Sequence, residues 1–250
     1  MSARADDFDP AGWGDSVADI WDDLYSKQTS LGADATDLTV ERLAELAGDG
    51  PILELGVGTG RVAIPLADRG FSVNAIEASQ GMVEALRAKP GGDRIRVRNG
   101  DFARDETGEP HSLVFAICNA MLSLDSQEDQ IRCFERVARQ LRPGGLFVVE
   151  AAASAPPPGA SIGVQYVGED GVIVCFTHYD RLTQRLRSRL MWIRDEGIRS
   201  ALTGGRLAPP SELDLMARMA GFRLQARWAG WADEPFAAGS AGHVTVYALP

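Results

Sequence analysis

The chain has 250 residues, of which 45% are hydrophobic and 24% are charged, and these values are typical of a globular protein with a sizeable core. Its formal net charge of −10 disfavours a nucleic-acid partner, because phosphate binding requires clustered Lys and Arg side chains. No apolar run predicts a membrane span, and the acidic N-terminal stretch does not resemble a secretory signal. Three scattered cysteines predict neither a disulfide framework nor a metal site, so we expect a cytoplasmic protein with reduced thiols.

The first 150 residues alternate between predicted helices and predicted strands. Apolar residues recur at helical spacing through residues 13–47, and Gly48 ends this region. Strands are then expected at residues 52–55, 72–76, 94–98, 111–118 and 146–150, with helices at 61–69, in a segment that ends at 88, and at 128–141. Such alternation indicates βαβ units and a parallel sheet.

The pattern changes after residue 150. The Ala- and Pro-rich stretch 151–160 predicts a flexible break. Residues 164–167, 172–179 and 186–194 are strand-like, with a turn at 169–171, which indicates antiparallel strands inserted in the parallel sheet or appended to it. A last helix is expected at 211–220, followed by strands at 222–228 and 244–248.

Residues 51–67 read PILELGVGTGRVAIPLA, with glycines at every second position from 56 to 60 between a predicted strand and a predicted helix. Glycine tolerates positive φ and lets a ligand approach the backbone. The carboxyl edge of an open α/β sheet is also where such folds bind ligands. Glu77 lies about 20 residues further on, where an acidic side chain accepts hydrogen bonds from ribose hydroxyls. These positions indicate a cofactor that contains a nucleoside.

The spacing of the glycines disfavours a dinucleotide. The fingerprint for a dinucleotide is G-x-G-x-x-G/A, and Arg61 stands where that pattern requires a small residue. Glu54 precedes the first glycine by two residues, and its carboxylate would attract a cation and repel a pyrophosphate. Asp101 ends the third predicted strand, within reach of an exocyclic amine. Three carboxylates at successive strand ends therefore fit a cofactor with a ribose, an adenine amino group and an ammonium.

Five ordered motifs resemble those of class I S-adenosylmethionine-dependent methyltransferases. They are ELGVGTG (54–60), IEASQGM (76–82), NGDF (99–102), NAMLSL (119–124) and LRPGGLFVVE (141–150). The resemblance implies an α/β fold with a Rossmann-like, doubly wound, mostly parallel seven-stranded sheet and an antiparallel last strand. An antiparallel β insertion after strand five is similar to that of members acting on small molecules such as amino sugars and antibiotic intermediates.

The resemblance also implies four regions. They are an N-terminal helical cap (1–50), a Rossmann-like core that binds S-adenosylmethionine (51–151), an antiparallel β insertion over the active site (152–205), and a last helix with a C-terminal strand pair that completes the core (206–250).

Individual residues acquire roles from the same resemblance. Three glycines would pass under the methionine part and the ribose, Glu54 would lie near the amino group, and Glu77 would bind the ribose hydroxyls. The complete implied set is Tyr25, Glu54, Gly56, Gly58, Gly60, Glu77, Ala78, Met82, Asp101, Phe102, Cys118 and Asn119, with Leu122 and Ser123 nearby. Alternatives stay open for four of them: Glu77 and Asp101 as solvated acids at strand ends, Glu54 as the partner of a helix N-cap, and Met82 as ordinary core packing.

The implied reaction moves the sulfonium methyl by in-line displacement to an oxygen or nitrogen of a small organic molecule, releasing S-adenosylhomocysteine. Candidate acceptors are a natural-product intermediate and the N-terminus of a peptide. A neutral amine needs little beyond positioning, whereas a hydroxyl needs a base. His178 and His243 are the candidate bases, with a surface or structural role as the alternative for each, and His111 is expected in a surface loop.

Two other functions and two oligomeric states stay open on the sequence. The chain could be an NAD-dependent oxidoreductase or a non-catalytic scaffold that binds the cofactor. It could act as a monomer or as a homodimer.

Overall fold

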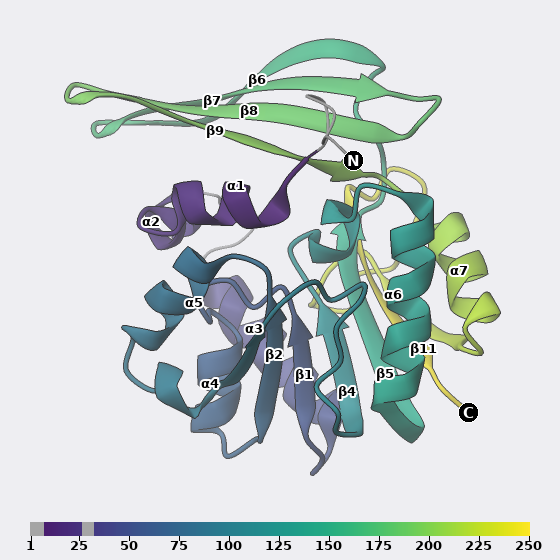
Figure 1. The fold of residues 1–250 in the computed structure, drawn as a ribbon. Helices are drawn as coiled ribbons and strands as arrows, with labels where there is room; N and C mark the ends of the chain where they lie inside the picture. The colour runs from purple at the N-terminus through teal and green to yellow at the C-terminus, as the bar shows by residue number, and fades with distance from the viewer. Residues whose placement is uncertain (1–7, 27–32) are drawn as a thin grey trace, which may run out of the picture.

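The computed structural model describes residues 8–26 and 33–250, which form a central sheet with helices on both faces and a second sheet above its carboxyl edge (Figure 1). The central sheet has seven strands in the order β10-β11-β5-β4-β1-β2-β3. The strands are β1 (Ile52–Leu55), β2 (Val73–Glu77), β3 (Arg96–Asn99), β4 (His111–Ala116), β5 (Leu141–Ala152), β10 (Arg223–Trp228) and β11 (Gly242–Ala248). Strands β1 to β5 pair in parallel, and β11 runs antiparallel to both β5 and β10. The predicted fold class is confirmed.

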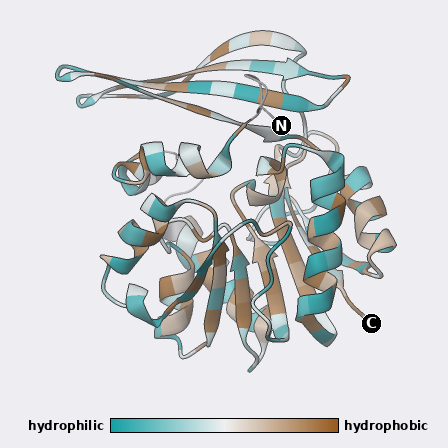
Figure 2. Cartoon of the chain, in the orientation of Figure 1, coloured by the Kyte–Doolittle hydropathy of each residue, from teal (hydrophilic) through white to brown (hydrophobic). Residues whose placement is uncertain are grey.

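The helices cover both faces of this sheet, so its inner strands are buried on both sides (Figure 1). The covering helices are α3 (Ala33–Ala47), α4 (Ala63–Asp68), α5 (Gln80–Arg87), α6 (Gln127–Gln140) and α7 (Pro210–Met219). Because successive side chains of a strand alternate between faces, Leu53 packs in the cluster under α6 and α7, whereas Ile52 packs in the cluster under α3 and α4. Hydrophobic strands between hydrophilic outer helix faces are visible in Figure 2. Every position of β1, β2 and β4 is therefore buried.

The N-terminal region differs from the single helical stretch that the sequence predicts. It forms α1 (Pro10–Val17) and α2 (Trp21–Ser26) before α3 begins. The side chain of Asp9 accepts a hydrogen bond from the amide of Ala11 and caps α1. Helices α1 and α2 lie between the carboxyl edge of the central sheet and the second sheet (Figure 1).

The second sheet consists of four antiparallel strands of ten residues each. They are β6 (Gly159–Gly168), β7 (Gly171–Asp180), β8 (Arg185–Arg194) and β9 (Gly197–Arg206), in that spatial order. The sequence predicts only the first three, because Gly197, Gly204 and Gly205 leave β9 with a weak strand signal. The sheet follows β5 and precedes α7, as expected for an insertion after the fifth strand.

A buried arginine fastens the second sheet to the central fold. Arg206 is 6% exposed, and its guanidinium donates hydrogen bonds to the side chains of Gln130, Gln184 and Glu212. Gly205 lies so close to the backbone of η2 (Ala120–Ser123) that a Cβ there would meet the carbonyl oxygen of Leu122 at 2.0 Å. The second sheet is therefore held rigidly where β9 meets the core.

The expectation that His111 lies in a surface loop is wrong. His111 is fully buried at the start of β4, where its ring nitrogens lie 3.0 Å from Nδ2 of Asn74 and 3.1 Å from the carbonyl oxygen of Gln140. Burial lowers the pKa of the imidazole. Within residues 8–26 and 33–250, no helix has the length and apolar composition of a membrane span.

Candidate active site

A cavity of about 940 Å³ lies at the carboxyl edge of the parallel strands. Its floor comes from the β1–α4 loop and the ends of β2, β4 and β5, which is the edge where open α/β sheets place ligands. Its walls come from α1, from β8 and β9 of the second sheet, and from the β10–β11 loop. Trp13 and Trp21 line the wall on the side of α1 and α2 and pack edge to face with their ring centroids 5.2 Å apart. The cavity thus lies between the sheet edge where such folds bind nucleotides and a wall of aromatic side chains.

The glycine loop borders the cavity with two of its three glycines. Gly56 and Gly58 line it with φ angles of +75° and +55°, a conformation that favours glycine. Gly60 also has a positive φ, but it is not among the lining residues, and a Cβ there would lie 3.0 Å from Cδ1 of Ile64. The loop therefore presents bare backbone to a ligand at its first two glycines, and Gly60 serves packing.

The acid at the end of β2 is held by backbone amides. Glu77 lines the cavity, and its Oε2 and Oε1 accept hydrogen bonds of 2.9 Å from the amides of Gly58 and Ser79. Burial raises the pKa of this carboxyl, and the two amides oppose that rise. Ala78 and Met82 also line the cavity, and Met82 is at the same time buried against α1.

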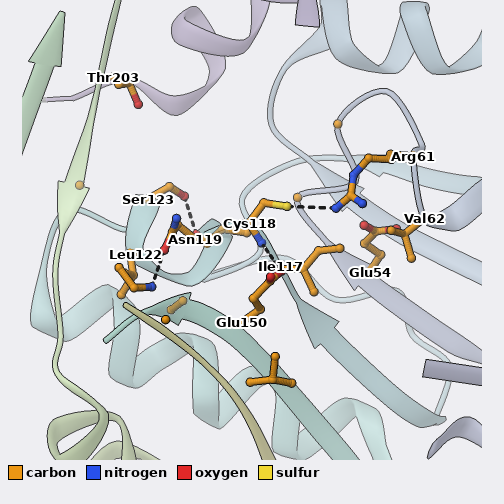
Figure 3. Close-up of a pocket in the computed structure, with 18 of the residues that line it drawn as sticks. Glu54, Arg61, Val62, Ile117, Cys118, Asn119, Leu122, Ser123, Glu150 and Thr203 are labelled. Carbon is orange, nitrogen blue, oxygen red and sulfur yellow. Dashed lines mark hydrogen bonds between the residues drawn. The ribbon is translucent and has the colours of Figure 1, made fainter. Parts of the chain in front are cut away.

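Glu54 and Arg61 lie on the same side of the cavity (Figure 3). Burial raises the pKa of Glu54 to about 8, although the guanidinium of Arg61 partly opposes this. Oε2 of Glu54 has no hydrogen-bond partner among the described residues. Arg61 donates to Oγ1 of Thr36 at 2.8 Å and to Sγ of Cys118 at 3.1 Å. A buried carboxylate oxygen without a partner fits a ligand that brings its own cation.

The end of β4 has a strained backbone. Cys118 and Asn119 are consecutive non-glycine residues with φ angles of +53° and +62°. The amide of Cys118 donates to Oε2 of Glu150 at 3.1 Å, and Oδ1 of Asn119 accepts from the amide of Ala152 at 2.7 Å (Figure 3). Left-handed non-glycine residues are costly and cluster at functional sites. The sequence analysis did not assign Glu150 a role, although this residue ends the last of the five motifs.

Of the remaining predicted cofactor residues, the structure places Asp101 differently from expectation. Phe102 lines the cavity, whereas Asp101 is not among the lining residues. The carboxylate of Asp101 accepts from the amide of Ala103 at 2.9 Å and forms an ion pair with Arg104. Tyr25 belongs to α2, but its side chain lies outside the part of the chain that the structure describes.

The fold places the two candidate bases in different environments. His178 is exposed on β7 and is not among the residues that line the cavity, so the structure does not place it where a base is expected. His243 does line the cavity at the start of β11, with Nδ1 2.8 Å from Oγ1 of Thr245. Burial, together with the nearby guanidinium of Arg227, lowers the pKa of His243 to about 4. His243 is therefore neutral at pH 7 and binds a proton weakly.

Comparison with known proteins decides the family. A family profile described as a methyltransferase domain matches residues 52–145. The CcbJ methyltransferase from Streptomyces caelestis is 35% identical to this chain, with a TM-score of 0.89 over 96% of this chain and 98% of that one. The chain belongs to the class I S-adenosylmethionine-dependent methyltransferases. The predicted enzyme class is confirmed, and the oxidoreductase and scaffold alternatives are not retained.

Two further proteins are similar to this chain over nearly its whole length. The cypemycin N-terminal methyltransferase from a Streptomyces species is 27% identical over 236 residues, which is 93% of this chain and 95% of that protein. The amino pentose methyltransferase CalS10 from Micromonospora echinaspora is 19% identical, with a TM-score of 0.70 over 92% of this chain and 97% of that one. The second likeness concerns the fold alone. Membership of the family makes S-adenosylmethionine the cofactor of this methyltransferase.

Proposed function

We propose that this methyltransferase acts on an amine nitrogen of a small natural-product intermediate. The observation that carries the proposal is Glu150, which lines the cavity at the end of β5 with its Oε2 fixed by the amide of Cys118. The other carboxylate oxygen has no hydrogen bond with a described residue. A carboxylate held in this way would accept a hydrogen bond from an amine N–H and so orient the nitrogen.

The charge of the cavity supports a cationic or basic ligand. Among the described lining residues, four carboxyl groups face one guanidinium: Glu54, Glu77, Glu150 and Glu234 against Arg61. We assign Glu54, Arg61 and Glu77 to the cofactor, since together they match an ammonium, a carboxylate and a ribose. Glu150 and Glu234 are then left for the acceptor. An acceptor that carries an amine would balance this excess of negative charge.

The cofactor supplies a methyl group on a positively charged sulfur, and the residues of this chain have to hold it and align the acceptor. In our proposal, the cofactor-binding residues are Glu54, Gly56, Gly58, Arg61, Glu77, Ala78, Met82, Phe102, Cys118 and Asn119. Asp101 and Tyr25 stay proposals carried over from the family resemblance. Holding two reactants in line supplies several kcal/mol of the barrier, about 7 to 11 kcal/mol in the best intramolecular cases.

No strong base is part of this proposal. A histidine with a pKa of about 4 is a poor acceptor for the proton of a hydroxyl, which argues against an oxygen nucleophile. An amine attacks through its own lone pair when it is neutral, so it requires orientation more than deprotonation. We assign His243 to a hydrogen-bonding wall of the acceptor site. The helices before residue 51 and the strands of residues 152–205 would form the other walls.

The relatives agree with nitrogen as the acceptor atom. The name of the cypemycin enzyme refers to the N-terminus of its substrate, and the similarity spans nearly the whole chain. A peptide with a free N-terminus is therefore the second candidate acceptor. Its amine would meet the same carboxylate, and only the walls of the cavity would distinguish it from a small molecule.

The test has two stages. Calorimetric titration with S-adenosylhomocysteine, with NAD as the control, should give micromolar binding of the first compound alone. An acceptor panel of amino sugars, other small amines, their hydroxyl counterparts and short peptides is then incubated with S-adenosylmethionine. We expect a mass gain of one methyl group on amines and none on the hydroxyl counterparts. Methylation of the hydroxyl compounds alone would overturn the proposal of an amine.

A further inference from the structure

Four of the described side chains that line the cavity carry a hydroxyl group, and two of these hydroxyls are engaged within the chain. Oγ1 of Thr59 donates to the carboxylate of Asp22 at 2.6 Å, and Oγ of Ser123 donates to a carbonyl oxygen of η2 at 2.7 Å. The other two belong to Ser154 and Thr203, and neither has a hydrogen bond with a described residue. These two hydroxyls are therefore available to a ligand in the cavity.

Of these two residues, Thr203 has the more fixed position. Ser154 lies in the exposed linker between β5 and β6, whereas Thr203 belongs to β9. Two residues beyond it, the backbone of Gly205 lies against η2, and the buried Arg206 follows. Figure 3 shows Thr203 on the side of the cavity away from Arg61, with its hydroxyl oxygen directed toward the cavity. A hydrogen-bonding group on a rigid element gives a binding site selectivity.

Thr203 is also the cavity end of a row of hydroxyl side chains on the inner face of the second sheet. The strand register pairs one residue from each strand in this row, in the order Ser161, Thr177, Ser188 and Thr203. The row lies on the inner face because Ala201, two residues before Thr203, packs against the N-terminal helices. Oγ1 of Thr177 lies 2.9 Å from Oγ of Ser188, so these two hydroxyls satisfy each other, and Ser161 is exposed. Thr203 is therefore the member of the row that faces the cavity without a partner among the described residues.

The wall around Thr203 is otherwise apolar. Leu186 pairs with Gly205 across β8 and β9, Leu122 approaches Gly205 from η2, and both leucines line the cavity together with Leu207. A few polar groups in an apolar pocket fix the orientation of a ligand. A ligand that brings only apolar atoms to this wall would leave the hydroxyl of Thr203 without a partner, which is costly. We therefore expect the acceptor to bring a polar atom to β9.

An uncharged oxygen fits this position better than a second amine. The carboxyl groups that line the cavity lie at the ends of β1, β2 and β5 and in the β10–β11 loop, and none lies on β8 or β9. An ammonium would be attracted to those carboxyl groups rather than to a neutral hydroxyl. The hydroxyl of Thr203 both donates and accepts, so a hydroxyl, an ether oxygen and a carbonyl oxygen are all suitable partners.

We propose that Thr203 is a specificity-determining residue that selects acceptors carrying an oxygen substituent, to which its hydroxyl forms a hydrogen bond. The inference rests on the proposed function, because it describes the part of the acceptor that lies away from the reacting amine. In an amino sugar the substituent is a ring hydroxyl, and in a peptide it is the carbonyl oxygen of the first amide.

Steady-state assays test this role, with S-adenosylmethionine at saturation and the acceptors that the panel identifies. Each methylated amino sugar is compared with its monodeoxy counterparts, and each methylated peptide with the counterpart whose first amide is a thioamide, a weaker hydrogen-bond acceptor. The wild type should prefer the oxygenated member of one pair about 3- to 10-fold in kcat/KM, the effect of one neutral hydrogen bond. Thr203→Val keeps the branched shape and should lose this preference, whereas Thr203→Ser should retain it.

Ser161→Ala is the matched control, because Ser161 belongs to the same row but is exposed on β6 and is not among the lining residues. It should show the preference of the wild type. Calorimetry with S-adenosylhomocysteine should give one affinity for all these proteins, which reports an intact fold and cofactor site.

The remaining outcomes separate this inference from the proposed function. If amines are methylated but the wild type shows no preference within any pair, Thr203 has no such role and the proposed function stands. A preference that survives in Thr203→Val also overturns the inference alone. Methylation of hydroxyl compounds without any methylation of amines overturns the proposed function, and this inference with it.

Discussion

The amide of Gly58 donates a hydrogen bond of 2.9 Å to Oε2 of Glu77, so the acid at the end of β2 holds the glycine loop at the end of β1. The amide of Ser79 donates to the other oxygen of the same carboxylate. The proposed ribose ligand is thus also the support of the loop on which the cofactor would lie. A substitution at Glu77 is therefore expected to weaken cofactor binding twice, by removing the ribose ligand and by loosening the glycine loop.

Glu77→Ala should weaken the binding of S-adenosylhomocysteine by at least ~10-fold, since hydrogen bonds to a charged group contribute about 1.5 to 3 kcal/mol each. Calorimetry of the purified variant measures the affinity, and a thermal melt reports whether the fold persists. Glu84→Ala is the matched control, because Glu84 is an exposed glutamate on the neighbouring helix α5. Unchanged affinity in Glu77→Ala, with a normal melt, would remove the ribose role.

Glu54 should make the stability of the ligand-free enzyme depend on pH. Its folded pKa of about 8 exceeds the ordinary pKa of 4.5 for a glutamate, so the folded state retains a proton that the unfolded state loses. Stability therefore falls as pH rises from about 4.5 to 8 and levels off above that range. Glu54→Gln removes this titration. We expect the melting temperature of the wild type to fall by several degrees relative to Glu54→Gln between pH 5.5 and pH 8, at about 2 to 4 °C per kcal/mol.

The same group should link cofactor affinity to pH in the opposite direction. An ammonium beside Glu54 favours the ionised carboxylate, so binding releases a proton below pH 8. The affinity of the wild type for S-adenosylhomocysteine should therefore rise between pH 6 and pH 8, whereas that of Glu54→Gln should be lower and flat. Parallel pH profiles for the two proteins would contradict the assignment of Glu54 to the ammonium.

Much of the central fold could be predicted from the sequence, because it depends on two local signals, which are short apolar runs and glycines at turns. Buried parallel strands such as residues 52–55 are short apolar runs, and the strand predicted there has the observed bounds. Gly56 and Gly58 predict a turn, and both residues adopt the positive φ angles that favour glycine. The break between α1 and α2 is not predicted by the sequence, because apolar spacing continues across it and both helices pack against the distant second sheet.

The parts of the site that the sequence misplaced depend on distant contacts. His178 and His243 are similar as sequence signals, and only the strand order puts one on an exposed face and the other in the cavity. Glu150 closes a recognised motif, but its role depends on the amide of Cys118, which is 32 residues away. Asp101 has an ion-pair partner three residues along in Arg104, which motif spacing does not reveal.

Glu150→Gln should raise the KM for the acceptor amine and leave the affinity for S-adenosylhomocysteine unchanged. The substitution keeps the shape of the side chain and a carbonyl oxygen for the amide of Cys118, but it removes the negative charge. Loss of one charge-assisted hydrogen bond predicts a ~10- to 100-fold decrease in kcat/KM. Glu169→Gln, in the exposed turn between β6 and β7, serves as the control. A selective loss of cofactor affinity would instead assign Glu150 to the cofactor.

His243→Gln should have a small effect on the rate. With a pKa of about 4, His243 does not titrate near neutral pH, so the dependence of kcat on pH between 6 and 9 should follow the acceptor amine in both proteins. A true general base contributes about 10²- to 10⁴-fold. A loss of that size, together with a missing inflection in the pH profile, would restore His243 as the base. Steady-state assays across the pH range measure both quantities.

Asp22 connects the N-terminal helices to the glycine loop and should slow the release of the cofactor. Its Oδ1 accepts a hydrogen bond of 2.6 Å from Oγ1 of Thr59, and its Oδ2 forms an ion pair of 2.6 Å with Lys89. The surface ion pair adds little, but Thr59 is buried, and its hydroxyl would lose its acceptor in Asp22→Ala. The cost of an unsatisfied buried group, about 1 to 3 kcal/mol, predicts dissociation that is ~5- to 100-fold faster.

Stopped-flow displacement of bound S-adenosylhomocysteine would measure that dissociation rate. Asp37→Ala, at an exposed position of α3, is the control and should release the ligand at the wild-type rate. If the hydrogen bond between Asp22 and Thr59 keeps the N-terminal helices closed over the cavity, Asp22→Ala should release the ligand faster without lowering the stability of the central sheet. Glu84→Ala, the exposed control used above, should leave the dissociation rate unchanged. Equal rates in Asp22→Ala and the wild type would mean that the helices retain the cofactor through the packing of Trp13 and Trp21 alone.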